Sequence, residues 1–203
     1  MSGVLQQMLA IFSAGCVMSL AIIVTLRYTR TDNYISRFLP VAALPLLALP
    51  VNGLPVYNYI RGIIGDLSIV SQGLVLATVV AHVIGKNLVD FNSHRWLYPV
   101  IVVAGIVLYP AALGLGPIDS YQWGFSGLAL PVAVLLVTVF MILKEAWFAA
   151  SLLVVAVLLA GIPAMESRNL WDYLLDPAVF VYALFPVVRK LKHADAGKNR
   201  QLI

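Results

Sequence analysis

Seven apolar stretches, separated by short polar connections, run along this chain. A helix that crosses a bilayer needs about 20 mostly apolar residues, and lipid offers no partners for backbone hydrogen bonds. The pattern therefore predicts an all-α, polytopic integral membrane bundle of about seven transmembrane helices, in one domain, with a basic cytoplasmic tail after it. The stretches cover residues 4–26, 38–54, 67–84, 96–115, 127–143, 147–164 and 173–188, so that the bundle is residues 1–188 and the tail is 189–203.

The second stretch, residues 38–54, is the one whose crossing the pattern leaves open. Pro40, Pro45, Pro50 and Pro55 recur every five residues, and each proline removes a backbone donor and can kink a helix. If this stretch only dips into the bilayer, the bundle has six spans. Seven spans separate the charges of the connections better, so we expect seven.

The Lys and Arg residues predict the orientation, because cytoplasmic connections carry the excess of positive charge. With seven spans and the N-terminus outside, the outer side keeps only Arg61 and Arg168. We therefore expect an outer N-terminus and a cytoplasmic C-terminus in a bacterial inner membrane. The inner side then holds Arg27, Arg30, Arg37, Lys86, Arg95, Lys144, Arg189, Lys190, Lys192, Lys198 and Arg200.

Composition agrees with a membrane environment. Hydrophobic residues make up 62% of the chain and charged residues 11%, well outside the usual range of soluble domains. We attribute the net charge of +4 to topology and anionic lipid headgroups rather than to nucleic acid. The first stretch is expected to remain as a span, since no Lys or Arg precedes it as in a removable signal.

Three connections meet on the outer side, at residues 56–66, 116–125 and 166–172. Trp and Tyr in them favour the headgroup layer, and two cations and several carboxylates accompany the aromatic residues. We expect this outer face to bind a ligand, together with one carboxylate at the start of the last stretch. The candidate binding residues are Arg61, Asp66, Asp119, Trp123, Glu166, Arg168, Asp172 and Asp176.

Arg61 and Asp176 are the most unusual of these residues. An Arg followed by two glycines can hold a phosphate bidentately, although an interfacial Arg also snorkels without any ligand. If the last helix begins near residue 167, then Arg168, Asp172 and Asp176 share one helical stripe. Asp176 would then pair with Arg168 or Arg61, because an unpaired carboxylate at that depth is costly. The alternative is that Asp176 caps a later helix, with Pro177 as its first residue.

Structural roles compete with binding at the other polar positions. Asp66 can cap the helix of the third stretch. Asn169 and Asp172 resemble a capping box that opens the last helix. Asp119 lies in a Gly-Pro loop, where aspartate commonly forms turns.

Motifs of known local chemistry are missing from the sequence. His82, His94 and His193 are too scattered for a haem or metal cage, and the single Cys16 excludes an intrachain disulfide. We expect no cofactor and no metal. Few ionisable residues lie inside the apolar stretches, which argues against a proton-driven transporter.

Two functions from different classes remain, with a small flippase or channel behind them. The first is a non-catalytic membrane subunit whose outer face binds a lipid headgroup, an envelope glycan or a partner protein. The second is a transferase or hydrolase for a lipid-linked phosphate substrate, with Asp66, Glu166 or Asp172 as general base. We favour the first because the short connections leave few residues that could form a catalytic site. Membrane lipids and a protein partner or oligomer are the expected partners, since small residues on several stretches allow close helix approach.

Overall fold

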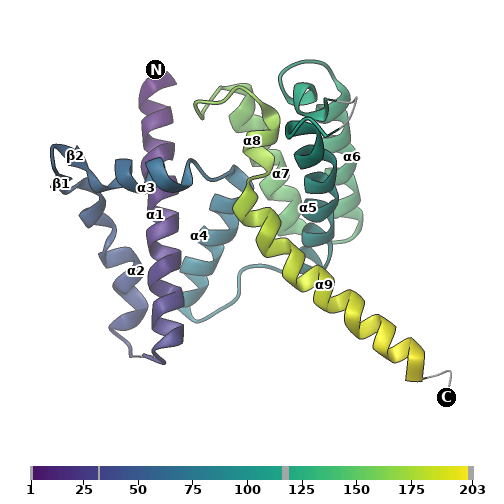
Figure 1. Ribbon diagram of the computed structural model, residues 1–203. Helices are drawn as coiled ribbons and strands as arrows, with labels where there is room; N and C mark the ends of the chain where they lie inside the picture. The colour runs from purple at the N-terminus through teal and green to yellow at the C-terminus, as the bar shows by residue number, and fades with distance from the viewer. Residues whose placement is uncertain (1, 32, 116–118, 201–203) are drawn as a thin grey trace.

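The computed structural model describes residues 2–31, 33–115 and 119–200, and its regular structure is mostly helical. The all-α class predicted from the sequence is therefore confirmed (Figure 1). The longer helices are α1 (Ser2–Tyr28), α4 (Ile69–Ile84), α5 (Phe91–Ala112), α6 (Ala129–Leu143), α7 (Trp147–Gly161) and α9 (Pro177–Arg200). The shorter ones are α2 (Leu39–Ala42), α3 (Val56–Ile64), α8 (Leu170–Leu174) and the 3-10 helices η1 (Ser36–Phe38), η2 (Leu44–Ala48) and η3 (Ser120–Gly124).

Two helices are long and apolar enough to cross a membrane, judged by length and composition. They are Gly3–Tyr28, close to the N-terminus, and Phe91–Ala112. Four shorter apolar helical segments accompany them, at Ser36–Ala48, Ile69–Ile84, Ala129–Leu143 and Trp147–Gly161. The count of seven spans stays a prediction.

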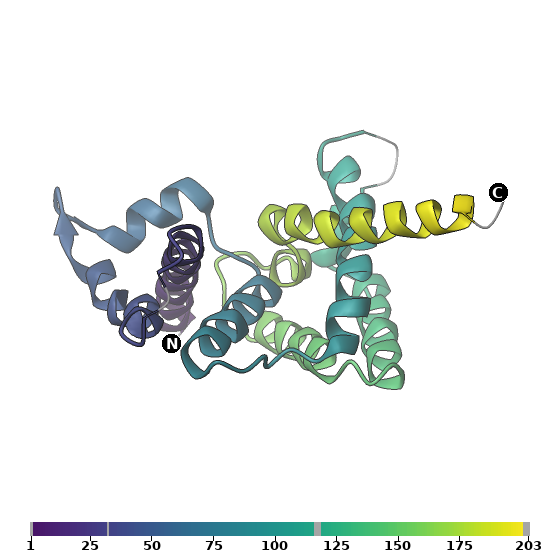
Figure 2. The same ribbon diagram turned by 90° about the horizontal axis from the view of Figure 1, so that it is seen from below.

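The helices form two groups that share a core. α1 packs against α2, α3 and α4 in one group, whereas α5, α6, α7 and α8 form the other, and α4 and α7 join the two. Figure 2 shows the two groups from below, with α9 crossing the second group and pointing away from the bundle. Buried residues of α4 to α9 form the core, which Leu5 and Leu9 of α1 reach from its edge.

The Pro-rich second stretch does not form one continuous helix. It is divided into η1, α2 and η2 and then turns at Asn52 and Gly53, both with positive φ, between the short antiparallel strands β1 (Pro50–Val51) and β2 (Leu54–Pro55). Pro40 and Pro45 are the second residues of α2 and η2, in the first turn, where a missing backbone donor costs least. The segment lies along α1 (Figure 1).

The last stretch is also divided, and here the structure corrects a prediction. Leu175 is extended between α8 and α9, and α9 begins at Pro177. The ring of Pro177 disfavours a helical conformation at the preceding residue, Asp176, so the two helices are not continuous. Arg168, Asp172 and Asp176 therefore do not share one helical stripe, and that expectation is wrong. α9 continues past Val188 to Arg200, through most of the predicted tail, while residues 201–203 lie outside the described part.

Candidate functional site

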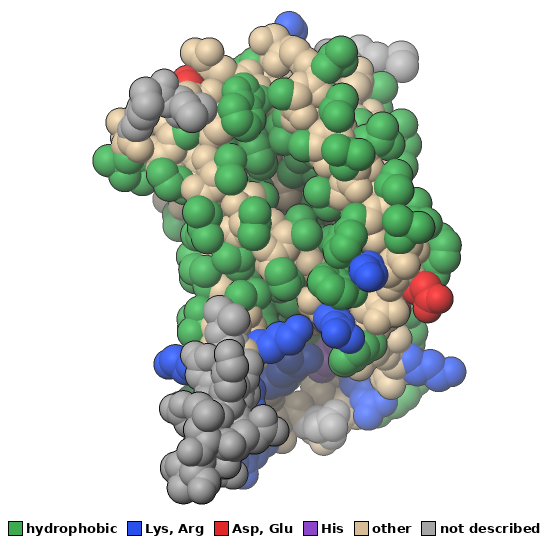
Figure 3. All heavy atoms as spheres, turned by 90° about the vertical axis from the view of Figure 1, so that its right-hand side faces the viewer, with side chains coloured by type: hydrophobic (Ala, Val, Ile, Leu, Met, Phe, Trp, Pro, Cys, Tyr) green, Lys and Arg blue, Asp and Glu red, His purple; other side chains and the backbone are tan. Residues whose placement is uncertain are grey.

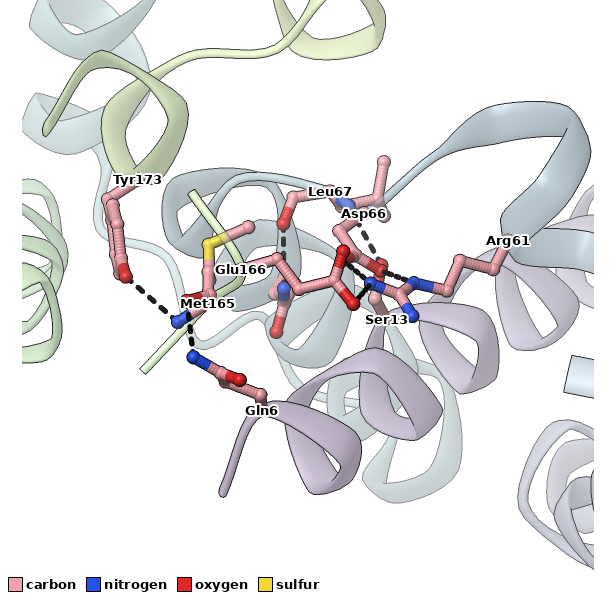
Figure 4. Close-up of polar contacts among 9 residues, drawn as sticks. Gln6, Ser13, Arg61, Asp66, Leu67, Met165, Glu166 and Tyr173 are labelled. Carbon is pink, nitrogen blue, oxygen red and sulfur yellow. Dashed lines mark hydrogen bonds and ion pairs between the residues drawn. The ribbon is translucent and has the colours of Figure 1, made fainter. Parts of the chain in front are cut away.

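The guanidinium of Arg61 is the centre of a charged cluster. Its Nε donates to Oδ1 of Asp66 at 2.9 Å and its Nη2 donates to Oδ2 at 2.8 Å, and Nη2 also lies 2.8 Å from Oε1 of Glu166. Gly65, with φ of 79°, ends α3 and returns the chain so that Asp66 faces Arg61. Three of the predicted binding residues are thus brought together, as Figure 4 shows.

The cluster is unevenly exposed. The side chains of Arg61 and Asp66 are 28% and 19% exposed, whereas that of Glu166 is 67% exposed. The hydrogen bonds to Asp66 and then to Glu166 raise the pKa of the Arg61 guanidinium, so it stays charged. Two carboxylates against one guanidinium leave the cluster with a net charge of −1, carried outward by Glu166.

Polar side chains of α1 hold the backbone on both sides of this cluster. The Leu67 N–H donates to Oγ of Ser13 at 2.8 Å, and Nε2 of Gln6 donates to the carbonyl oxygens of Pro163 and Met165 at 3.3 and 3.2 Å. The hydroxyl of Tyr173 accepts from the Met165 N–H at 2.8 Å (Figure 4). The segments that carry Asp66 and Glu166 are therefore fixed to a common helix.

Asp176 has a structural role rather than an ionic one. Its Oδ2 accepts from the Ser68 N–H at 2.9 Å and from the Ser71 hydroxyl, and its Oδ1 accepts from the Val179 N–H at 2.9 Å. Asp176 is 8% exposed, and its carboxylate joins the N-terminal ends of α4 and α9. Of the two alternatives left open by the sequence, the pair with Arg168 or Arg61 is therefore wrong, and the cap ahead of Pro177 describes the structure.

Asp172 belongs to a second polar group that joins η3 to α8. It accepts from the Tyr121 hydroxyl at 3.2 Å and from the Ser167 hydroxyl. Burial, reinforced by the Asp172 carboxylate, raises the pKa of the Tyr121 phenol. Asn169 caps α8 through the Trp171 N–H at 3.0 Å and donates to the Tyr121 carbonyl at 3.0 Å. Asn169 is therefore the predicted cap, but Asp172 is not its capping-box partner.

The contact between η3 and α8 is close enough to require glycine. A Cβ added to Gly124 would lie 1.7 Å from Oδ1 of Asn169 and 2.9 Å from Cδ1 of Trp171. Nε1 of Trp171 donates to the Ser120 carbonyl at 2.8 Å on the same side. The η3 segment is consequently packed onto α8.

The other predicted residues lie apart from the Arg61 cluster. Asp119 is exposed and accepts from the backbone of Tyr121 at 3.1 Å, as a turn-forming aspartate does. Trp123 is 42% exposed and lines an apolar groove, and Arg168 is exposed in the α7–α8 connection. Residues 116–118 of the predicted loop lie outside the described part. Asp66 does not cap α4, because Ser68 does so through the Ser71 N–H at 3.1 Å.

Sequence reasoning missed the residues that support these groups. Gln6 and Ser13 are seven positions apart, which places both on one face of α1, and that spacing was the available signal. Asp90 is a further such residue: it caps α5 through the Ser93 N–H at 2.7 Å and also accepts from the Phe148 N–H at 3.2 Å. Burial opposes ionisation of Asp90, but the hydrogen bonds from Ser93 and Phe148 outweigh it and hold the pKa of that carboxyl below its usual range.

The chemistry open to these groups is limited. Among the described residues, no group of three or more His, Cys, Asp and Glu side chains could hold a metal ion. Asp66, Asp172 and Asp176 all accept hydrogen bonds from the protein, which leaves Glu166 as the most open carboxylate of the Arg61 cluster. Comparison with protein-family models, curated proteins and solved structures found no match.

Proposed function

We propose that the protein is a multi-pass subunit of a bacterial inner membrane, with seven spans, an outer N-terminus and a cytoplasmic C-terminus. Two helices of membrane-crossing length and four shorter apolar segments supply six of these spans, and the apolar first half of α9 supplies the seventh. Lys and Arg side chains gather at the lower end of the molecule in Figure 3, below a largely apolar surface. That separation fits the excess of positive charge on cytoplasmic connections.

Within that membrane, the subunit's task is to dock a partner protein on its outer face without catalysis. The observation that carries this proposal is the Arg61–Asp66–Glu166 cluster, which joins α3 to the α7–α8 connection and leaves Glu166 open. A phosphate would have to displace two carboxylates from Arg61, so an anionic lipid headgroup suits the cluster poorly. A protein segment that carries Lys or Arg can instead pair with Glu166, because complementary charges at an interface favour association.

The hydrogen bonds of the carboxylates also favour docking over a transferase or hydrolase activity. A general base needs a free lone pair within hydrogen-bonding reach of its substrate. Asp66 and Asp172, two of the three residues considered for that role, are engaged by Arg61 and by Tyr121 and Ser167. Glu166 remains, without an oriented nucleophile beside it among the described residues.

The test is purification in mild detergent followed by quantitative mass spectrometry of the co-purifying proteins and lipids. Glu166→Lys reverses the open charge and leaves the Arg61–Asp66 pair in place, so folding should be little affected. We expect a stoichiometric protein with the wild type and its loss by about tenfold with Glu166→Lys, since one interfacial charge pair is worth about 1.5 kcal/mol or more.

Lys86→Glu is the matched charge reversal on the inner side and should retain the partner. Equal recovery from both variants would contradict docking at Glu166. Recovery of only a lipid or a glycan, lost with Glu166→Lys, would replace the protein partner by that ligand.

A further inference from the structure

An apolar groove runs between α5 and α6, on the face turned to the viewer in Figure 3. Its volume is about 510 Å³, within the roughly 300–1,000 Å³ typical of pockets for single small molecules. α5 contributes the side from Trp96 to Val107, α6 contributes Ala133 and Val137, and Leu153 of α7 lies at the floor. Every lining residue is apolar or aromatic.

Aromatic rings and two cations mark the inner end of the groove. The rings of Trp96 and Phe140 meet edge to face with centroids 5.3 Å apart, which brings α5 and α6 together there. Arg95 lies 5.3 Å from the Trp96 centroid, and Nζ of Lys144 lies 5.6 Å from Trp96 and 5.9 Å from Phe140. Both cations are exposed, as is Glu145, the carboxylate next to Lys144.

The length of the groove fits one leaflet of a bilayer. From Trp96 to Val107, α5 advances about 16 Å at 1.5 Å per residue, which is about half of the ~30 Å hydrocarbon core. Arg95 and Lys144 then stand at the level of the inner headgroups. The inner leaflet of a cell membrane is negatively charged and attracts such residues.

We propose that this groove binds one hydrocarbon chain of an anionic phospholipid, whose phosphate contacts Arg95 and Lys144. The inference rests on the proposed membrane topology but not on the outer docking face. The apolar lining can contact a hydrocarbon chain along the whole length of the groove. The two exposed cations then favour a negatively charged headgroup. The negative charge of Glu145 is outnumbered by the two cations at the rim.

Quenching of tryptophan fluorescence by brominated lipids tests this proposal, because Trp96, Trp123 and Trp171 line the groove. Purified protein is reconstituted into phosphatidylcholine vesicles with increasing fractions of either dibromo-phosphatidylglycerol or dibromo-phosphatidylcholine. We expect half-maximal quenching at a roughly tenfold lower fraction of the anionic lipid, since Arg95 and Lys144 contribute about 1 kcal/mol each and Glu145 offsets part of that sum. The double variant Arg95→Gln/Lys144→Gln should remove that preference.

Blocking the groove provides the second arm. Ala133 is exposed and lines the groove, so Ala133→Phe fills the space without disturbing the core and should lower quenching by both lipids. Leu135 lies on the opposite face of α6 and is 61% exposed, so Leu135→Phe is the matched control and should behave as wild type.

Equal quenching by the two lipids in the wild type, or unchanged quenching in Ala133→Phe, would overturn the proposal and leave only unspecific lipid contact. Failure of the membrane topology is distinguishable from that result. A protein that remains monodisperse in buffer without detergent or vesicles would overturn the topology itself, whatever the quenching data show.

Discussion

At the scale of single residues, most carboxylates of the predicted site bond to other parts of the protein and support its fold. Glu166 is the one that the Arg61 cluster leaves open. Local chemistry predicted Asn169 as a cap and Asp119 as a turn former, because both bond to backbone within three residues. It failed for Asp66, which pairs with Arg61 five positions earlier instead of capping α4. For Asp176 it offered the cap at Val179 as one alternative, but not the contacts with α4. The Asp176 contact with Ser71, 105 positions away, has no signal in a single sequence.

Asp176→Ala tests the junction between α4 and α9. The substitution leaves the buried N–H groups of Ser68 and Val179 without their acceptor, so we expect a loss of about 3 kcal/mol of unfolding free energy. Thermal unfolding in detergent measures it. Asp119→Ala, at an exposed turn, should cost about 0.5 kcal/mol, and similar losses in the two variants would contradict the assigned role of Asp176.

Asp90 gives a prediction on pH dependence. Its pKa is lower in the folded protein than the ordinary value of 3.8, so its stabilisation is present above that value and is lost as pH falls toward the folded pKa. Unfolding of Asp90→Asn, followed by circular dichroism from pH 7 to pH 3, should show lower stability at pH 7 and a smaller acid-induced loss than the wild type. An unchanged acid-induced loss in Asp90→Asn would show that the hydrogen bonds from Ser93 and Phe148 do not depend on the charge.

At the scale of elements, apolar runs predicted where helices lie but not where they break. The second stretch follows its prolines and breaks into short pieces, and the last one breaks before Pro177. Prolines marked these places in the sequence. However, α5 contains Pro99 and Pro110 without breaking, so the presence of a proline does not by itself predict a helix break. The small residues expected to allow close helix approach are Ala104, Gly105, Ala149, Ala150, Ala156 and Ala160. Four of them, Gly105, Ala149, Ala150 and Ala156, are buried within the chain, and the association with a partner helix stays a prediction.

The contact of α5 with α9 depends on Gly105. A Cβ there would lie 2.2 Å from Cδ2 of Phe180, so Gly105→Ala should destabilise the protein by about 1–3 kcal/mol through overpacking. Phe180→Leu in the same chain should recover part of that loss, and a double-mutant cycle in thermal unfolding measures the coupling. Gly161→Ala, with nothing within 4 Å of the added Cβ, is the control; additive effects of Gly105→Ala and Phe180→Leu would refute the contact.

At the scale of the whole molecule, composition and periodicity predicted the all-α class. They could not predict which helices pack against one another. The meeting of Arg61 with Glu166 and the groove between α5 and α6 both depend on helix packing across long sequence separations. The number of spans and the orientation follow from charge and length, so they remain proposals together with the outer docking face.

The most direct test of that docking face is labelling by a membrane-impermeant maleimide of single cysteines in a Cys16→Ser background. Arg168→Cys stands two positions from Glu166, and Ser126→Cys directly follows the predicted outer connection 116–125; both positions are exposed. In intact cells we expect fast labelling of Ser126→Cys and slow labelling of Arg168→Cys, because the partner covers the latter. After purification in a detergent that strips partners, both should react fast. Equally fast labelling of both in cells would contradict docking at this face, and protection of both until the cells are opened would contradict the orientation.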